Sequence, residues 1–556
     1  MLSTSTSARY PSGWGRIFDR SDRGLLRSLM PRGSEWMLLG PLLLFVLLRI
    51  PSWFEPHWYT DEGGYAVTAW LSTHGLTLYQ QVWNNKPPLL FWVYSLSLAV
   101  TGPSEFGLHI MSTIAGLVTL LAIWKIALDG WSRWRALMAL LIAVLLLGTP
   151  IINGELALPE NLLIAPTALA MLVVIMTQRS GAQGSTVFGG ILAGALFGSA
   201  MLLQQTAVAG FIAALLWLLF LPAGGGRRLL VWMTCTAIVL GLAAIAPYVL
   251  LAGFHNVFFL LVLSYVGYAR SSLPFNWVDL GIRIGELAAL LVGAFLGRSR
   301  SPRQLLWLWA SASLIMATAA NRPYIFFTVP TVPPLAILVC GTAIPKLRSG
   351  LWPRLRSQLR PALRTLPLVL ATIVPLLSWT TLLVVTDHGS LTTGSLYTVG
   401  MTRTYYQTFL GYLDGTISPV AYANSFDPRV VSEDRSVAWL HSHHLQGSTA
   451  VVWSYDAWAY VLGDLHPMLP TPAVYVDVLW LGLQTTLNMV DQGQPQVIIV
   501  SRGAAREWPQ IYTLLRHNAY VRTYVYGYDQ IWVAHKVAQN LNLLSSARRP
   551  AAGPAN

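Results

Sequence analysis

Charge is scarce in this sequence. Only 11% of its 556 residues are Asp, Glu, Lys or Arg, and 54% are hydrophobic, whereas soluble domains carry about 25% charged residues. So few charges could not cover the surface of a soluble chain of this length, which excludes a soluble enzyme or binding module. The composition predicts an α-helical polytopic membrane protein.

Cysteine is almost missing as well. Cys235 and Cys340 both sit inside apolar segments, which argues against a disulfide framework. The chain also has no Walker loop and no dinucleotide-binding fingerprint. The histidines of "HSHH", residues 441 to 444, have no cysteine or carboxylate at a familiar metal spacing, and we interpret them as a surface run.

The basic excess does not indicate a nucleic-acid partner. The net charge is +13, but the lysines and arginines form short clusters between apolar runs, as the positive-inside rule places them in membrane proteins. Residues 1 to 35 carry arginines but are too long and polar for the start of a cleaved signal peptide. We therefore expect a cytosolic N-terminal tail in a protein of the cell membrane.

Long apolar runs recur along the first two thirds of the chain. A transmembrane helix needs about 20 apolar residues. On that basis we predict eleven spans, at residues 36–53, 106–127, 135–152, 161–177, 186–203, 206–222, 229–251, 279–297, 304–320, 324–344 and 366–386.

The segment from Lys86 to Gly102 is the doubtful case. Its uninterrupted apolar stretch is shorter than a span and suits an interfacial or re-entrant helix. If it crossed, every later loop would change sides, and most basic clusters would lie outside, against the positive-inside rule. We therefore predict that it does not cross, which leaves Lys86 on the outer side with Asp61.

The composition changes after the last predicted span. "STAVVWSY" and "PQVIIVSR" are typical of buried strands, "AREWPQIYTLLRHN" of an amphipathic helix, and "YVRTYVYGYDQIWVAHK" of two strands that turn at Gly527. We predict a membrane domain at 36–386, a small α/β extracytoplasmic domain at 387–540 and a disordered tail at 541–556.

Four carboxylates are predicted in the outer loops: Asp61, Glu62, Glu155 and Glu160. At the water-facing mouth of a bundle such groups stay ionised at little desolvation cost, and they can act as a general base or bind a divalent cation. The alternative is that they only cap helices. Asp61 precedes a predicted amphipathic helix, "EGGYAVTAWLSTHG", whose N-terminus an acid would stabilise.

Basic residues also occur on the predicted outer side, where they are normally rare. Lys86, Arg270 and Arg322 lie beside aromatic or proline residues. A lone basic residue at a helix end usually snorkels to lipid headgroups. Three of them, with Tyr265, Tyr268 and Tyr324 alongside, equally suit a phosphate site. The pair Gln204 and Gln205, at a helix–helix corner, could be a polar hinge or part of the pocket.

These motifs resemble a known family. "TDEGGYAVTA", "NKPPL", "ALPENLL" and "RPYIFFTVPTVPPLAIL" are similar, in order and spacing, to motifs of the GT-C glycosyltransferases that use polyprenyl-phosphate sugars. That group contains the protein O-mannosyltransferases and the lipid A aminoarabinose transferases. The resemblance implies a GT-C bundle with juxtamembrane helices and an inverting transfer from a lipid-phosphate sugar.

The resemblance also implies roles for individual residues. Asp61 matches the catalytic base, Glu62 follows it in the same motif, and Glu160 matches the second-loop acid. Lys86 and Arg322 match phosphate-contacting positions, and with Arg270 from the outer cations and the motif tyrosines Tyr65 and Tyr324 they are the expected ligands of the donor phosphate. Asn85 stands where the aminoarabinose enzymes have a glutamate, so their sugar and acceptor do not carry over.

The sequence therefore favours an integral-membrane glycosyltransferase of the cell envelope. Its partners would be a polyprenyl-phosphate sugar donor, the lipid bilayer and a lipid, glycan or protein acceptor, with no nucleic acid. The residues do not decide whether a divalent cation is required. A flippase or other transporter for lipid-linked sugars, and a non-catalytic membrane scaffold, are the alternatives; a transporter would place ionisable groups deep in the bundle.

Overall fold

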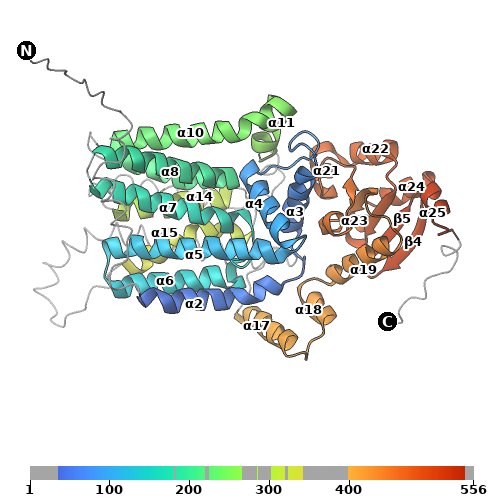
Figure 1. Ribbon diagram of the computed structural model, residues 1–556, viewed down its shortest axis with the longest axis horizontal. Helices are drawn as coiled ribbons and strands as arrows, with labels where there is room; N and C mark the ends of the chain where they lie inside the picture. The colour runs from blue at the N-terminus through green and yellow to red at the C-terminus, as the bar shows by residue number, and fades with distance from the viewer. Residues whose placement is uncertain are drawn as a thin grey trace, which may run out of the picture.

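The protein has a helical bundle and a smaller part built around a β-sheet (Figure 1). The computed structural model describes residues 36–180, 183–219, 225–265, 302–319, 324–341 and 399–544, together with residues 285 and 288. The predicted tails at 1–35 and 545–556 lie outside the described residues.

Long apolar helices run side by side in the bundle (Figure 1). The first, α2 (Trp36–Arg49), continues as a short 3-10 helix, η2 (Ile50–Phe54). The other helices of the bundle are α5 (Glu105–Gly130), α6 (Arg133–Gly148), α7 (Pro159–Ser180), α8 (Gln183–Leu203), α9 (Val208–Leu219), α10 (Gly225–Ala252), α14 (Pro302–Ala319) and α15 (Val332–Gly341).

The bundle matches the predicted membrane spans closely. Nine of the eleven predicted spans coincide with described helices, whereas 366–386, and 279–297 apart from residues 285 and 288, lie outside the described residues. Among the described helices, five are long and apolar enough to cross a membrane: Trp36–Phe54, Glu105–Gly130, Pro159–Ser180, Ser185–Leu203 and Gly226–Ala252. The predicted membrane fold is therefore confirmed, without fixing the number of spans.

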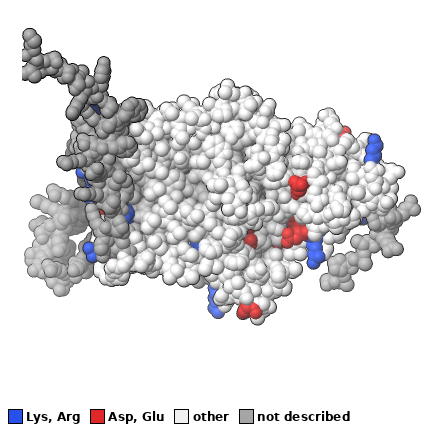
Figure 2. Space-filling view, in the orientation of Figure 1, with Lys and Arg blue, Asp and Glu red and all other residues white. Residues whose placement is uncertain are grey.

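The flank of the bundle exposes hydrocarbon. Leu39, Val239 and Leu250 are 70%, 64% and 86% exposed, and Figure 2 shows a flank almost free of charge, with the charged residues toward the two ends. An apolar surface of this extent is unfavourable in water and suits the interior of a bilayer.

Two shorter helices cover one end of the bundle. These are α3 (Thr60–Thr73) and α4 (Pro88–Thr101), each of 14 residues. A helix of that length reaches about 21 Å, less than the roughly 30 Å hydrocarbon core. The predicted short helix after Lys86 is thus present, and it packs beside α3.

The helix α3 lies between the bundle and the sheet-containing part (Figure 1). It packs against α20 (Trp458–Leu462). A Cβ on Gly63 would lie only 2.7 Å from Cδ1 of Trp458, so glycine permits the close approach. In the following loop, the Trp83 backbone N–H donates to the Pro470 carbonyl over 2.7 Å.

The C-terminal part begins with three helices and continues into a five-stranded sheet. The helices are α17 (Val399–Leu413), α18 (Pro419–Phe426) and α19 (Pro428–Ser442). The strand order is β2 (His466–Pro467), β1 (Thr449–Trp453), β3 (Val497–Ser501), β5 (Asp529–Val533) and β4 (Val521–Tyr526). The β2–β1 and β1–β3 pairs are parallel, and the β3–β5 and β5–β4 pairs are antiparallel.

Successive side chains along β1 point to opposite faces of the sheet, and each face has its own hydrophobic core. Ala450 and Val452 face the hydrophobic core shared with the bundle, whereas Val451 and Trp453 face a second core, as the two-residue period of a strand requires. The helices of the second side are α21 (Val474–Leu481), α22 (Leu483–Gly493), α23 (Arg502–Glu507) and α24 (Gln510–His517), and α25 (His535–Asn540) follows β5.

The predicted strands are present, with the turn at Gly527 in the left-handed region at φ +53°. One detail differs from the expectation. The single helix predicted over "AREWPQIYTLLRHN" is two helices, α23 and α24, separated at Trp508 and Pro509, because proline removes a backbone donor and clashes with the preceding turn.

Candidate active site

Lys86 is the centre of the candidate site. Its side chain is only 9% exposed, and its Nζ donates to the Tyr265 hydroxyl over 3.3 Å. The ammonium also lies over the rings of Tyr65, 5.8 Å from the centroid, and of Tyr265, 5.7 Å away. Cation–π contacts and a hydrogen bond therefore hold the charge in place while leaving it free to meet an anion.

Two predicted acids lie within electrostatic reach of this cation. Burial lowers the pKa of Lys86, but Tyr265, Glu160 and Asp61 outweigh that effect and raise it above its ordinary value. Burial raises the pKa of Asp61, Lys86 opposes the rise, and the neighbouring Glu62 adds to it. The site thus holds a permanent cation beside a carboxyl with increased affinity for a proton.

Asp61 does not cap α3. The N-cap residue of the helix is Tyr59, and no side-chain capping hydrogen bond is present. Asp61, half-buried, sits in the first turn and makes no side-chain hydrogen bond to any part of the chain that the structure describes. Its carboxylate thus lacks the backbone hydrogen bond of a helix cap, which the helix-cap alternative did not expect.

Gln204 and Gln205 belong to the site. Helix α8 ends at Leu203, and Gln204 is extended with φ −157° before a 3-10 turn, η4 (Gln205–Ala207). Gln204 donates to the Glu160 carboxylate. Gln205 donates to the Asn85 carbonyl over 2.8 Å and accepts from the Tyr265 hydroxyl over 3.1 Å. Through these hydrogen bonds Gln205, at the break in the helix, links the loop that carries Lys86 to Tyr265.

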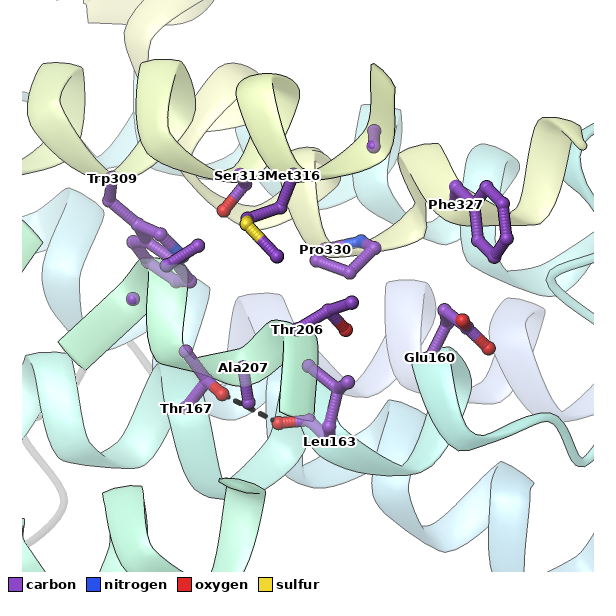
Figure 3. A pocket seen from close by; sticks show the side chains of 13 residues that line it. Glu160, Leu163, Thr167, Thr206, Ala207, Trp309, Ser313, Met316, Phe327 and Pro330 are labelled. Carbon is purple, nitrogen blue, oxygen red and sulfur yellow. Dashed lines mark hydrogen bonds between the residues drawn. The ribbon is translucent and has the colours of Figure 1, made fainter. Parts of the chain in front are cut away.

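Below Glu160 a cavity reaches into the bundle. Figure 3 shows Glu160 and Phe327 at one end and Trp309 toward the other, with Thr206, Met316 and Pro330 between them. The cavity lies among α7, η4, α9, α14 and the 3-10 helix η6 (Ile325–Thr331). Its lining changes from the Glu160 carboxylate at one end to mostly apolar side chains toward the other.

Tyr324, half-buried, belongs to an aromatic group at the same end of the bundle. It stacks on Phe326, with centroids 5.5 Å apart, and meets Phe327 edge-on at 5.7 Å; Tyr59 meets Phe326 edge-on at 6.5 Å. Burial, and then Asp61, Glu62, Glu160 and Tyr324, raise the pKa of Tyr59 well above its ordinary value. Tyr59 therefore connects the aromatic group to the acids.

Three predicted outer-loop acids are less exposed than the sequence suggested. Glu62, Glu155 and Glu160 are 0%, 2% and 2% exposed, so the expected low desolvation cost does not apply to them. Burial, followed by Glu55, raises the pKa of Glu155 to about 8. Glu62 turns away from the cavity, accepts from the Ala157 backbone N–H, and contacts His109.

The remaining predicted phosphate ligands, Arg270 and Arg322, lie outside the described residues. Sequence reasoning gave no role to Tyr59 and left that of Gln205 open. A polar pair inside an apolar run is the signal that marks Gln205. Among the described residues, Glu62, Glu105 and His109 form the one group of potential metal ligands whose ligating atoms lie within 4.8 Å of one another.

The fold is of the GT-C type, and the comparisons support the resemblance found in the sequence. The sequence profile described as "Dolichyl-phosphate-mannose-protein mannosyltransferase" matches residues 85–251. The chain is similar to ArnT from Cupriavidus metallidurans bound to undecaprenyl phosphate, with a TM-score of 0.56 and 15% identity over 92% of this chain and 99% of that one. The apo form gives a TM-score of 0.55.

A curated relative comes from Aeromonas hydrophila. Its undecaprenyl phosphate-alpha-4-amino-4-deoxy-L-arabinose arabinosyl transferase is 26% identical over 346 residues, which are 57% of this chain. The match spans 61% of that relative's length. An "Uncharacterized protein" of Aquifex aeolicus is 33% identical over 110 residues, 19% of this chain and 26% of that protein.

Proposed function

We propose that this chain is an inverting membrane glycosyltransferase. It moves a sugar from a polyprenyl-phosphate donor to an acceptor hydroxyl on the outer face of the cell membrane. One observation carries the proposal: Asp61 and Glu160, from two other segments of the chain, lie within electrostatic reach of the Lys86 ammonium, and Glu160 also lines the cavity. The similarity to transferases of lipid-linked sugars supports it.

The proposed reaction exchanges one C–O bond for another. The acceptor oxygen attacks the anomeric carbon from the face opposite the phosphate, and Asp61 takes the proton of the acceptor hydroxyl. The bond between the anomeric carbon and the phosphate oxygen breaks, and its electron pair leaves with the polyprenyl phosphate. Lys86 stabilises the charge that develops on that phosphate, with Arg270 and Arg322 as further expected ligands.

The cavity and the basic loops bear on the donor site and on the membrane side. The cavity has room for about one water molecule, so it suits a sugar hydroxyl beside the Glu160 carboxylate rather than an isoprenoid chain. The basic loops at Arg133, Arg179 and Arg227 support a cytosolic location for the opposite end of the bundle by the positive-inside rule. The sheet-containing part would then be extracytoplasmic and able to meet an acceptor.

The test is mass spectrometry of envelope glycolipids and glycoproteins from cells with the intact chain, with Asp61→Asn and without the chain. We expect one glycosylated product that requires Asp61. Asp414→Asn is the matched control because Asp414 lies in the exposed turn after α17. Identical products in all four strains would overturn the proposal. Translocation of the lipid-linked sugar without loss of its glycosidic bond would favour the transporter alternative.

A further inference from the structure

A second polar cluster lies behind α3, separate from the Lys86 site. It contains Glu62 from α3 and Glu105 and His109 from the first turns of α5, with exposures of 0%, 4% and 0%. The spacing Glu-x-x-x-His puts the two α5 residues on one helix face. Their potential ligating atoms and those of Glu62 all lie within 4.8 Å of one another.

The imidazole of His109 has a fixed tautomer. Its Nδ1 faces the Ser52 carbonyl oxygen within hydrogen-bond distance, and because a carbonyl can only accept, Nδ1 carries the hydrogen. The Nε2 atom lies 3.3 Å from both carboxylate oxygens of Glu62. A lone pair on Nε2 would be repelled by the two carboxylate oxygens. A proton or a metal ion must therefore lie between Nε2 and the Glu62 carboxylate.

A proton on Nε2 would neutralise only one of the two acids. Both carboxylate oxygens of Glu105 are buried and have no hydrogen-bond partner. The nearby buried cation, Arg49, donates to the Thr113 hydroxyl and to the Gly154 and His109 carbonyls rather than to either of these carboxylates. Burying an unpaired carboxylate is costly, so Glu105 must take up either a proton or a bound cation.

The distance between His109 and Glu62 suits a shared metal ion. Two ligands about 2.0–2.1 Å from a tetrahedral zinc ion lie about 3.4 Å apart, close to the 3.3 Å between His109 Nε2 and Glu62. Metal ligands in proteins are usually oriented by hydrogen bonds to their other polar atoms. Here the Nδ1–H of His109 donates to the Ser52 carbonyl, and Glu62 accepts from the Ala157 backbone N–H. One imidazole with two carboxylates favours Zn²⁺ or Mn²⁺ over Mg²⁺ or Ca²⁺, which prefer all-oxygen sites.

We infer that Glu62, Glu105 and His109 bind one divalent transition-metal ion. The ion joins the first turn of α3 to the start of α5. Since Asp61 precedes Glu62 in that turn, the ion fixes the backbone that carries Asp61. The positioning of Asp61 rests on the proposed function, whereas metal binding by the three ligands does not. An experiment can therefore refute one without refuting the other.

The experiment measures metal content and thermal stability of the full-length protein in detergent, purified through a tag without histidine. The forms compared are wild type, Glu105→Gln, His109→Gln and Asp61→Asn, each from medium supplied with Zn²⁺ or Mn²⁺. We expect about one ion per chain in the wild type and in the control Asp61→Asn, and at least a fivefold loss in the other two. Added metal should raise the melting temperature of the chelator-treated wild type by about 3 °C or more.

Glu105→Gln keeps the test decisive if His109→Gln fails to fold. The Glu105 carboxylate makes no hydrogen bond, so the amide should not disturb the metal-free fold. If the cluster holds only protons, Glu105→Gln will be as stable as the wild type with or without metal. That result, or a folded wild type without bound metal, would overturn the inference. Inactive Asp61→Asn protein with full metal content would leave it standing.

Discussion

Lys86 Nζ and the Tyr265 hydroxyl lie 3.3 Å apart although 179 positions separate them in the chain. The contact joins the loop before α4 to the segment after α11 (Phe254–Phe258). Because the phenol accepts from the ammonium and donates to Gln205, it sets the direction of a buried positive charge. The predictions on donor binding start from this pair.

Lys86→Ala should weaken donor binding by about tenfold to a hundredfold, the usual range for a lost charge-assisted hydrogen bond. Lys86→Arg should lose less, since charge is retained although its geometry differs. The donor affinity of Tyr265→Phe should lie between those of the wild type and Lys86→Ala, because the Lys86 ammonium stays but loses its hydrogen-bond acceptor. Binding of undecaprenyl and dolichyl phosphate to purified protein measures this. Unchanged affinity in Lys86→Ala would remove Lys86 from the site.

Asp61→Asn should lower turnover by about two to four orders of magnitude, the range for losing a positioned base. Donor binding and the melting temperature should stay near those of the wild type, because Asp61 makes no side-chain hydrogen bond within the described residues and the substitution keeps its shape. Single-turnover transfer with the donor identified from the envelope is the measurement. Near-native turnover by the folded variant would require another base.

Gln205→Met should weaken donor binding by a smaller factor, about threefold to tenfold, through the position of Lys86. The substitution removes the donor to the Asn85 and Leu261 carbonyls and the acceptor for Tyr265, and it preserves chain length. Double-mutant cycles with Lys86→Ala measure the coupling. If the two effects add independently, Gln205 does not act through Lys86.

Membrane sidedness can be tested with single cysteines. Gln80 and Ser132 are both exposed, and Figure 1 places the α3–α4 connection and the α5–α6 junction at opposite ends of the bundle. In a background with Cys235 and Cys340 replaced by serine, an impermeant thiol reagent added outside should label the cysteine at 80 and not that at 132. The reverse pattern would invert the proposed topology.

Acid should stabilise the sheet around Asp529. Burial, and then Asp456, raise the pKa of Asp529 to about 7, against the opposing charge of Arg429. An unfolded aspartate titrates near 3.8, so the folded state binds the proton more tightly. The stabilisation is complete below about pH 3.8 and disappears as pH rises through about 7. Hydrogen exchange in β4 and β5 should therefore accelerate between pH 5 and 8 beyond its intrinsic pH dependence.

Asp529→Asn is the matched variant for this effect. It mimics the neutral carboxyl and should flatten the pH dependence while slowing exchange at pH 8. Asp491→Asn, on the exposed side of α22, should leave the profile unchanged. Equal pH dependence in Asp529→Asn and the wild type would assign the effect to another buried acid, such as Asp456 or Glu433.

The sequence predicted the bundle well because apolar length is a local property. It also singled out Asp61, Lys86 and Glu160, which the structure brings within electrostatic reach of one another, since charges in an otherwise uncharged region stand out. It could not predict that Glu62, one residue from Asp61, faces the opposite way toward His109, because side-chain direction on α3 depends on what packs around it. The break at Gln204 shows the same limit: only the tertiary contacts to Glu160 and Asn85 reveal why two glutamines interrupt an apolar run.

The contact between Gly63 and Trp458 has a consequence for biosynthesis. The segment that carries Asp61 emerges from the ribosome early, yet the indole against which it packs is made nearly four hundred residues later. Until then, the face of α3 at Gly63 has no Trp458 side chain to pack against. A nascent or truncated chain can therefore insert its helices before α3 acquires this packing partner, and under the proposed function it would begin transfer only when its own synthesis is almost finished.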